Sequence, residues 1–157
     1  MTYRIFLHGL DSSSQGTKGR YFKEKFPGML VPDFSGSLSA RMEKLNDILS
    51  EKTDIKLVGS SFGGLMASIF TLENSSRVKS LTLLAPAINI NEFNDYRELS
   101  TEVSTTVYHG TEDSVIPIDP VYERARKCFK NLIFHRVEDD HMLHKTFGTI
   151  DWPAILK

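Results

Sequence analysis

Residues 59–63 read Gly-Ser-Ser-Phe-Gly, a pattern that can hold a serine at the apex of a sharp turn. An apolar run typical of a strand, KLV, precedes it, and a run typical of a helix, LMASIF, follows it. Residues two positions before and after the apex come close together in such a turn, where a Cβ atom on either would crowd the backbone. Glycine at 59 and 63 removes that crowding, so the pattern predicts Ser61 as a nucleophile.

Two other interpretations of this turn have to be weighed. A glycine turn in which serine only caps the following helix stays open on this motif alone. A phosphate-binding loop is disfavoured, because neither glycine-rich loop contains Gly-Lys-Ser or Gly-Lys-Thr, and residues 12–16 (SSSQG) lack that pattern. The choice depends on whether the chain supplies partners for a reactive serine.

A serine hydroxyl needs a base to take its proton and an acid to orient that base. The stretch TTVYHGTEDSVIP offers Asp113 just past a predicted strand, with Glu112 as runner-up, although a solvated loop carboxylate is the alternative. The stretch HRVEDDHMLHK offers His141 past the last predicted strand. Its rivals are His135, expected to point into the core or a helix layer, and His144, expected in the first turn of the last helix.

An acyl-transfer site also needs two backbone N–H groups aimed at the developing negative oxygen. One is expected from Phe62, the residue after the nucleophile. The other is expected from Leu10, in the loop FLHGLDSSS that follows the first predicted strand. Gly9 gives this loop backbone freedom, and His8 is expected to brace it by hydrogen bonding.

Periodicity and turn residues predict the elements that must position these groups. The predicted strands are 2–7, 29–32, 55–58, 78–85, 105–109 and 132–137. The predicted helices are 18–26, 37–52, 62–74 and 144–156. A further helix is predicted to run to residue 130, with Asp119 as its N-cap. Strands alternating with helices predict a three-layer α/β/α sandwich around a mainly parallel, six-stranded sheet. Every candidate residue follows a strand, so all are expected at the carboxyl edge of that sheet.

Length and composition favour one compact domain over residues 1–157. The formal net charge of -1 gives no sign of a nucleic-acid partner, and no stretch approaches the roughly 18 apolar residues that span a bilayer. The N-terminal apolar run is too short for a signal peptide, and the single cysteine, Cys128, excludes an internal disulfide. We therefore expect a cytoplasmic protein in which Cys128 is structural.

The chain resembles the α/β-hydrolase superfamily in four motifs and in their order. These are a strand followed by HGLDSS, then GSSFGG, then HGTEDSVIP and finally DDH. The resemblance runs from Tyr3 to Trp152 and is most similar to the small YqiA-like bacterial esterases. It implies a serine esterase or thioesterase that acts on small acyl esters or thioesters without a cofactor or metal. The triad roles then fall to Ser61, Asp113 and His141, and the oxyanion roles to Leu10 and Phe62.

The chain departs from larger members of that superfamily in two ways. No strands precede the His-Gly strand, and between Ala87 and Thr105 there is room for no large lid. Phe93, Tyr96 and Leu99 in that stretch are expected to form a small apolar wall beside a shallow site. An amidase or peptidase using the same triad, and a non-catalytic binding module with this fold, remain the alternatives.

Overall fold

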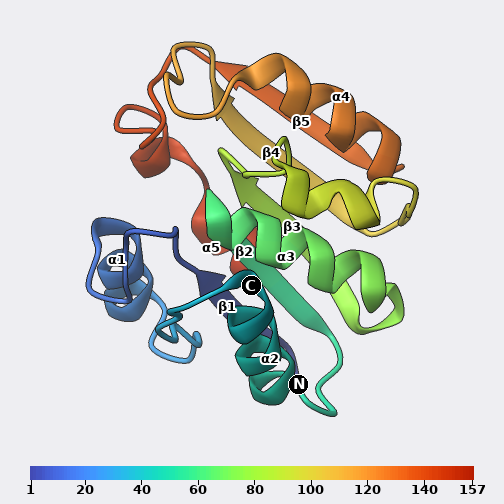
Figure 1. The fold of residues 1–157 in the computed structure, drawn as a ribbon. Helices are drawn as coiled ribbons and strands as arrows, with labels where there is room; N and C mark the ends of the chain where they lie inside the picture. Colours follow the sequence, from blue (N-terminus) through green and yellow to red (C-terminus); the bar gives the residue numbers. More distant parts are fainter.

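The computed structural model describes all 157 residues and contains one five-stranded, fully parallel sheet (Figure 1). The sheet order follows the chain: β1 (Tyr3–Leu7), β2 (Ile55–Ser60), β3 (Val78–Leu84), β4 (Ser104–Gly110) and β5 (Leu132–Val137). The helices are α1 (Thr17–Lys25), α2 (Leu38–Ile48), α3 (Phe62–Glu73), α4 (Ile118–Cys128) and α5 (Trp152–Leu156). Three short 3-10 helices connect them: η1 (Ser75–Arg77), η2 (Asn91–Tyr96) and η3 (Phe147–Thr149).

The predicted strand at residues 29–32 is reduced to a single bridge between Leu30 and Ile5, so the sheet has five strands and not six. Leu30 donates its N–H to the Arg4 carbonyl at 2.8 Å and accepts from the Phe6 N–H at 2.9 Å. The next donor in this parallel ladder would be residue 32, which is a proline without an N–H. Pairing therefore stops after one residue.

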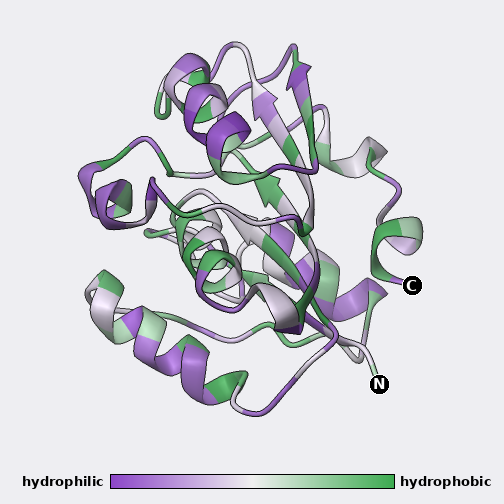
Figure 2. Cartoon of the chain, turned by 90° about the vertical axis from the view of Figure 1, so that its right-hand side faces the viewer, coloured by the Kyte–Doolittle hydropathy of each residue, from purple (hydrophilic) through white to green (hydrophobic).

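The strands bury side chains on both faces, as a sheet covered on both sides requires. Successive residues alternate: Ile5 and Leu7 pack in the larger core cluster, whereas Phe6 between them packs in the smaller one. Because each crossover runs in the same direction and right-handed crossovers are the rule, α2, α3 and α4 all cover one face. The other face is covered by α1 and α5, through Phe22, Trp152 and Leu156. Figure 2 shows hydrophobic colour on the inner strands, whereas the two arrowheads at the top of the view are hydrophilic.

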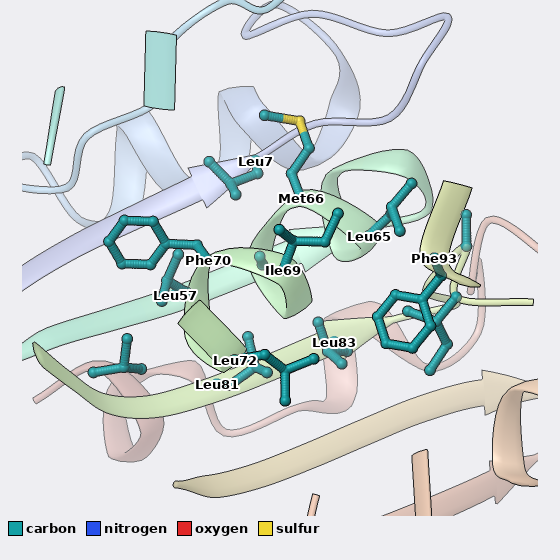
Figure 3. Close-up of a cluster of buried hydrophobic side chains, with 14 of the residues drawn as sticks. Leu7, Leu57, Leu65, Met66, Ile69, Phe70, Leu72, Leu81, Leu83 and Phe93 are labelled. Carbon is teal, nitrogen blue, oxygen red and sulfur yellow. The ribbon is translucent and has the colours of Figure 1, made fainter. Parts of the chain in front are cut away.

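The helix α3 is the central element of the larger cluster, since every residue from Gly63 to Leu72 is buried. Figure 3 shows its side chains meeting those of the sheet: Leu65, Met66, Ile69, Phe70 and Leu72 lie against Leu57, Leu81 and Leu83. A helix packed along its whole length has little freedom to move, so it holds the turn at its N-terminus in place. No helix of the structure is long and apolar enough to cross a membrane.

Several helix boundaries differ from the sequence prediction, and α2, predicted to run to residue 52, ends at Ile48. The predicted cap at Asp119 is wrong, because the N-cap is Pro117 and α4 begins at Ile118, so Asp119 lies in its first turn. The long last helix is also wrong, since only Trp152–Leu156 is α-helical. The amides of residues 145 and 146 donate to the buried Asp139 side chain at 3.0 and 2.8 Å. These hydrogen bonds hold residues 145 and 146 in a loop, and the chain therefore does not become helical here.

Candidate active site

Ser61 occupies the turn between β2 and α3 with φ 54° and ψ −116°, a conformation that only a constrained L-residue adopts. Its N–H donates to the Leu84 carbonyl at 2.9 Å. Its own carbonyl accepts from the N–H groups of Gly64 and Ala87, both at 2.9 Å. Hydrogen bonds to the end of β3 and to the new helix therefore fix the strained backbone from both sides.

The glycines around Ser61 are required by close backbone approach, as the sequence pattern predicted. A Cβ on Gly59 would overlap the Gly63 carbonyl, and a Cβ on Gly63 would overlap the Leu7 carbonyl of β1. A Cβ on Gly64 would lie 2.8 Å from the Pro86 Cβ. The turn is thus wedged between β1 and the chain leaving β3, with no space for larger residues.

The strain at Ser61 predicts that Ser61→Gly stabilises the fold. A strained non-glycine backbone costs about 1–3 kcal/mol, and glycine relieves it at an entropic cost of about 0.5–1 kcal/mol. We expect a net gain of about 1 kcal/mol, or about 2–4 °C in Tm by calorimetry. Ser60→Gly is the matched control: it lies in β2 and is expected to lower Tm. Equal shifts in both variants would contradict the strain argument.

Asp113 and His141 are brought together from the loops after β4 and β5. The Nδ1 atom of His141 lies 2.8 Å from Oδ2 of Asp113, whose side chain is fully buried. The N–H groups of Val115 and Ile116 donate to Oδ1 of Asp113 at 2.8 and 2.7 Å. The carboxylate is therefore held by its own loop and presents its second oxygen to the imidazole. Glu112, the runner-up, is exposed and its carboxylate bonds to no histidine.

The two rival histidines, His135 and His144, do not contact Asp113. His135 is exposed and stacks on Tyr108 with ring centroids 4.6 Å apart, so the expectation that it points inward is wrong. The reason is that β5 is an edge strand, which only one neighbour and α4 cover. His144 bonds through Nδ1 to Oδ2 of Asp140 at 2.6 Å, and this hydrogen bond lowers the pKa of Asp140 to about 2.

The buried Asp139 shapes the loop that carries His141. Burial opposes its charged form, but hydrogen bonds from Thr146, Asp140 and Lys145 outweigh burial and lower the pKa of Asp139. Its carbonyl accepts from the Glu112 N–H at 3.1 Å. The loops that carry the acid and the base are therefore joined directly, which fixes the relative position of Asp113 and His141.

The loop after β1 lies against the serine turn. A Cβ on Gly9 would be 3.5 Å from the Ser61 Cβ, and the Leu10 N–H donates to no protein acceptor. The Phe62 N–H, at the first position of α3, has no intrahelical acceptor either. Two amides without a protein acceptor therefore lie in the segments next to Ser61: that of Phe62 follows it in the chain, and that of Leu10 follows Gly9. Ser61 and His141 make no hydrogen bond to each other in this structure.

The stretch between β3 and β4 forms no wall at this site, contrary to expectation. Phe93 is fully buried in the core, and Tyr96 packs against it with ring centroids 6.2 Å apart. Leu99 lines a surface hollow of about 450 Å³ with Arg97, Arg124 and Lys127. No group of three or more His, Cys, Asp or Glu side chains is placed to hold a metal ion.

Residues 9–102 match the sequence profile of the α/β hydrolase fold family. The chain belongs to this family. A comparison with curated proteins found no match. Among solved structures, this α/β hydrolase is similar to an α/β superfamily protein from Xanthomonas campestris pv. campestris, with 24% identity, a TM-score of 0.74 and coverage of 95% of this chain and 93% of that one. It is also similar to Est1E from Butyrivibrio proteoclasticus, with 16% identity, a TM-score of 0.76 and coverage of 98% and 85%.

These likenesses show the fold, in agreement with the family match. A third neighbour, the monoacylglycerol lipase of Paleococcus ferrophilus, has 12% identity, a TM-score of 0.66 and coverage of 86% of this chain and 83% of that one. The finer resemblance to small YqiA-like esterases stays a prediction.

This α/β hydrolase carries one more histidine at the site, which the sequence analysis missed. His109, at the end of β4, is fully buried, and its Nε2 donates to the Ile116 carbonyl at 2.9 Å. The same atom lies 3.3 Å from Oδ2 of Asp113, the oxygen that also meets His141. Burial lowers the pKa of His109, and its Nδ1 has no partner. The signal in the sequence was its place at the end of a predicted strand, as the first residue of the motif HGTEDSVIP, although no role was assigned to it.

The lowered pKa of His109 predicts a loss of stability in mild acid. Below about pH 6.5 the unfolded chain binds a proton that native His109 does not, so the free energy of unfolding falls as pH falls. The slope is at most about 1.4 kcal/mol per pH unit. Asp139 and Asp140, with lowered pKa values, lose their contributions only below about pH 4. Between pH 6.5 and 5, the effect of His109 on the free energy of unfolding can therefore be separated from the effects of these two carboxylates.

Urea unfolding at pH 7.5 and pH 5.2 measures this effect. His109→Gln keeps a donor near the Ile116 carbonyl but does not titrate, so its stability should change less between the two pH values. His135→Gln, at an exposed position, is the control and should behave as the parent protein. A His109→Gln protein with the parent's pH dependence would show that this histidine is not responsible.

Proposed function

We propose that this protein is a serine hydrolase that cleaves carboxylic esters or thioesters through Ser61, His141 and Asp113. The observation that carries the proposal is the 2.8 Å contact between Asp113 and His141, at the sheet edge where the strained Ser61 turn also lies. An acid–imidazole pair at the same sheet edge as a serine held in a strained turn supports nucleophilic acyl transfer, which uses these three groups.

In the proposed reaction, His141 takes the proton of the Ser61 hydroxyl as the oxygen attacks the acyl carbonyl. The N–H groups of Leu10 and Phe62 donate to the negative oxygen of the tetrahedral intermediate. His141 then protonates the leaving alcohol or thiol, and water repeats the sequence on the acyl-enzyme. Asp113 keeps the imidazole in the tautomer with Nδ1–H and stabilises its charged form. Ser61 and His141 have to approach one another when substrate binds.

The surroundings favour a small, open acyl site. Two surface hollows, of about 450 and 320 Å³, are lined by none of the residues assigned to the site. Leu10, a proposed oxyanion residue, and Met142, next to the proposed base His141, are exposed at 51% and 49%. Exposed apolar side chains beside a reactive serine suit short to medium acyl chains. Est1E has been observed with ferulic acid bound, so a feruloyl ester belongs among the substrates to test.

A fluorophosphonate probe tests the proposal directly. We expect covalent labelling of the native protein, located at Ser61 by peptide mapping, and none in Ser61→Ala or after heat denaturation. A native protein that stays unlabelled would favour the alternative of a non-catalytic binding module. Matched ester, thioester and amide substrates with one acyl group then separate an esterase or thioesterase from an amidase or peptidase.

A further inference from the structure

Arg41 is a buried cation without a counter-ion. It lies on α2 with only 4% of its surface exposed, and no carboxylate is within salt-bridge distance of its guanidinium. Its Nη1 atom is buried and has no hydrogen-bond partner. Burying an uncompensated charge costs free energy, so a functional reason is worth seeking.

The contacts of Arg41 converge on Leu10 and Phe62, the two residues proposed to supply the oxyanion amides. Its Nη2 donates to the Leu10 carbonyl at 3.3 Å, and its guanidinium lies over the Phe62 ring, 5.3 Å from the centroid. Its Nε is anchored on the Gly36 carbonyl at 3.0 Å, which fixes the side chain. One arginine thus joins the loop after β1 to the first residue of α3.

Arg41 holds the peptide unit that follows Leu10, and other groups hold the preceding unit, which carries the Leu10 N–H. The Gly9 carbonyl, in the same peptide unit as that amide, accepts from Nδ1 of His8 at 2.7 Å and from the Ser12 N–H at 3.2 Å. Nε2 of His8 accepts from the Phe34 N–H at 2.9 Å, so the proton of His8 is on Nδ1. Because a peptide unit is planar, holding its carbonyl also sets the direction of its N–H.

We infer that Arg41 is a positioning residue for the oxyanion hole. It holds the Leu10 carbonyl and the Phe62 ring in one arrangement, so that the two free amides keep their places beside Ser61. Its positive charge, which no carboxylate neutralises, also favours the negative oxygen that forms in the reaction. This inference rests on the proposed serine-hydrolase function and adds a residue that does not itself touch the substrate.

The test compares Arg41→Met and Arg41→Lys with Arg77→Met. Arg77 has the same contact chemistry: it bonds to the carbonyls of Leu49 and Lys52, and its guanidinium lies 5.3 Å from the Phe70 ring centroid. It precedes β3, however, and therefore lies at the opposite edge of the sheet. Arg77 is half-buried, and Arg77→Met thus reports what losing a guanidinium with such contacts does to the fold alone.

For Arg41→Met we expect kcat on an activated ester to fall about 10- to 100-fold with KM within about twofold, less than the loss of a direct oxyanion donor. Arg41→Lys keeps the charge but not the planar fork, so its kcat should fall at least about threefold. Affinity for a boronic acid, which forms a tetrahedral adduct with the serine, should fall in parallel with kcat/KM. Arg77→Met should lower Tm while leaving kcat and boronic acid affinity unchanged.

Unchanged kcat in a folded Arg41→Met protein, or losses equal to those of Arg77→Met, would overturn the inference while Ser61→Ala remained inactive. If Arg41→Met does not fold, Arg41→Lys tests the positioning role in its place. A lysine variant with the kcat and boronic acid affinity of the parent protein would reject that role. Parental activity in Ser61→Ala would instead reject the proposed function, and the role of Arg41 with it. The two failures are therefore distinguishable.

Discussion

Ser61→Ala is expected to lower turnover of an activated ester by about 10⁴-fold or more, because the members of a triad act as a unit. Without the hydroxyl there is no nucleophile for His141 to activate and no acyl-enzyme can form. The measurement is kcat under saturating substrate, with the uncatalysed rate subtracted. Binding of substrate itself should change little, since the amides of Leu10 and Phe62 and the exposed apolar side chains remain.

Ser60→Ala is the control for that variant. Ser60 is the adjacent residue, at the end of β2, and belongs to the same motif, but it is not at the apex of the turn. Its replacement should leave kcat within a few-fold of the parent. Near-parental turnover in a purified Ser61→Ala protein, or equal losses in both variants, would remove Ser61 from the role of nucleophile.

Gly63→Ala is expected to have the largest effect on stability. The added Cβ would overlap the Leu7 carbonyl, which is backbone of the buried strand β1 and has no free space to move into. Overpacking of this kind costs about 3 kcal/mol or more, a large part of the 5–15 kcal/mol that stabilises an ordinary domain. We expect either a fall in Tm of at least about 6 °C or failure to accumulate as folded protein.

Gly148→Ala provides the matched comparison. A Cβ at Gly148 meets no atom within 4 Å, and its φ is not positive, so alanine fits there without strain. This variant should melt within about 1 °C of the parent. If Gly63→Ala melted at the same temperature as Gly148→Ala, the close approach of the serine turn to β1 would not be a real constraint on the sequence.

The predictions that local patterns supported agree well with the structure. The Gly-Ser-Ser-Phe-Gly spacing anticipated both the turn at Ser61 and the crowding that excludes side chains at Gly59 and Gly63. The alternation of strands and helices anticipated a parallel sheet, and hence one edge at which Asp113 and His141 meet. These features follow from short-range geometry and from the handedness of crossovers, both of which the residue order dictates.

Other predictions depended on the tertiary packing of individual side chains, and several of those were wrong. His135 was expected inside because a strand residue usually faces a layer, but only the order of strands shows that β5 is an edge. Phe93 was expected beside the site, but it is fully buried in the larger core cluster instead. Neighbours distant in sequence decide such positions, and no local pattern encodes them.

The sequence by itself determined the chemistry: a serine in a glycine turn, followed in order by an acid and a histidine at strand ends. Only the tertiary structure decided which groups surround them. Arg41 lies three residues after Leu38 and four before Leu45, on the stripe that α2 buries, so a cation on an apolar face was a signal in the sequence. Its contacts with Leu10 and Phe62 arise from segments 31 and 21 residues away, and folding alone brings them together.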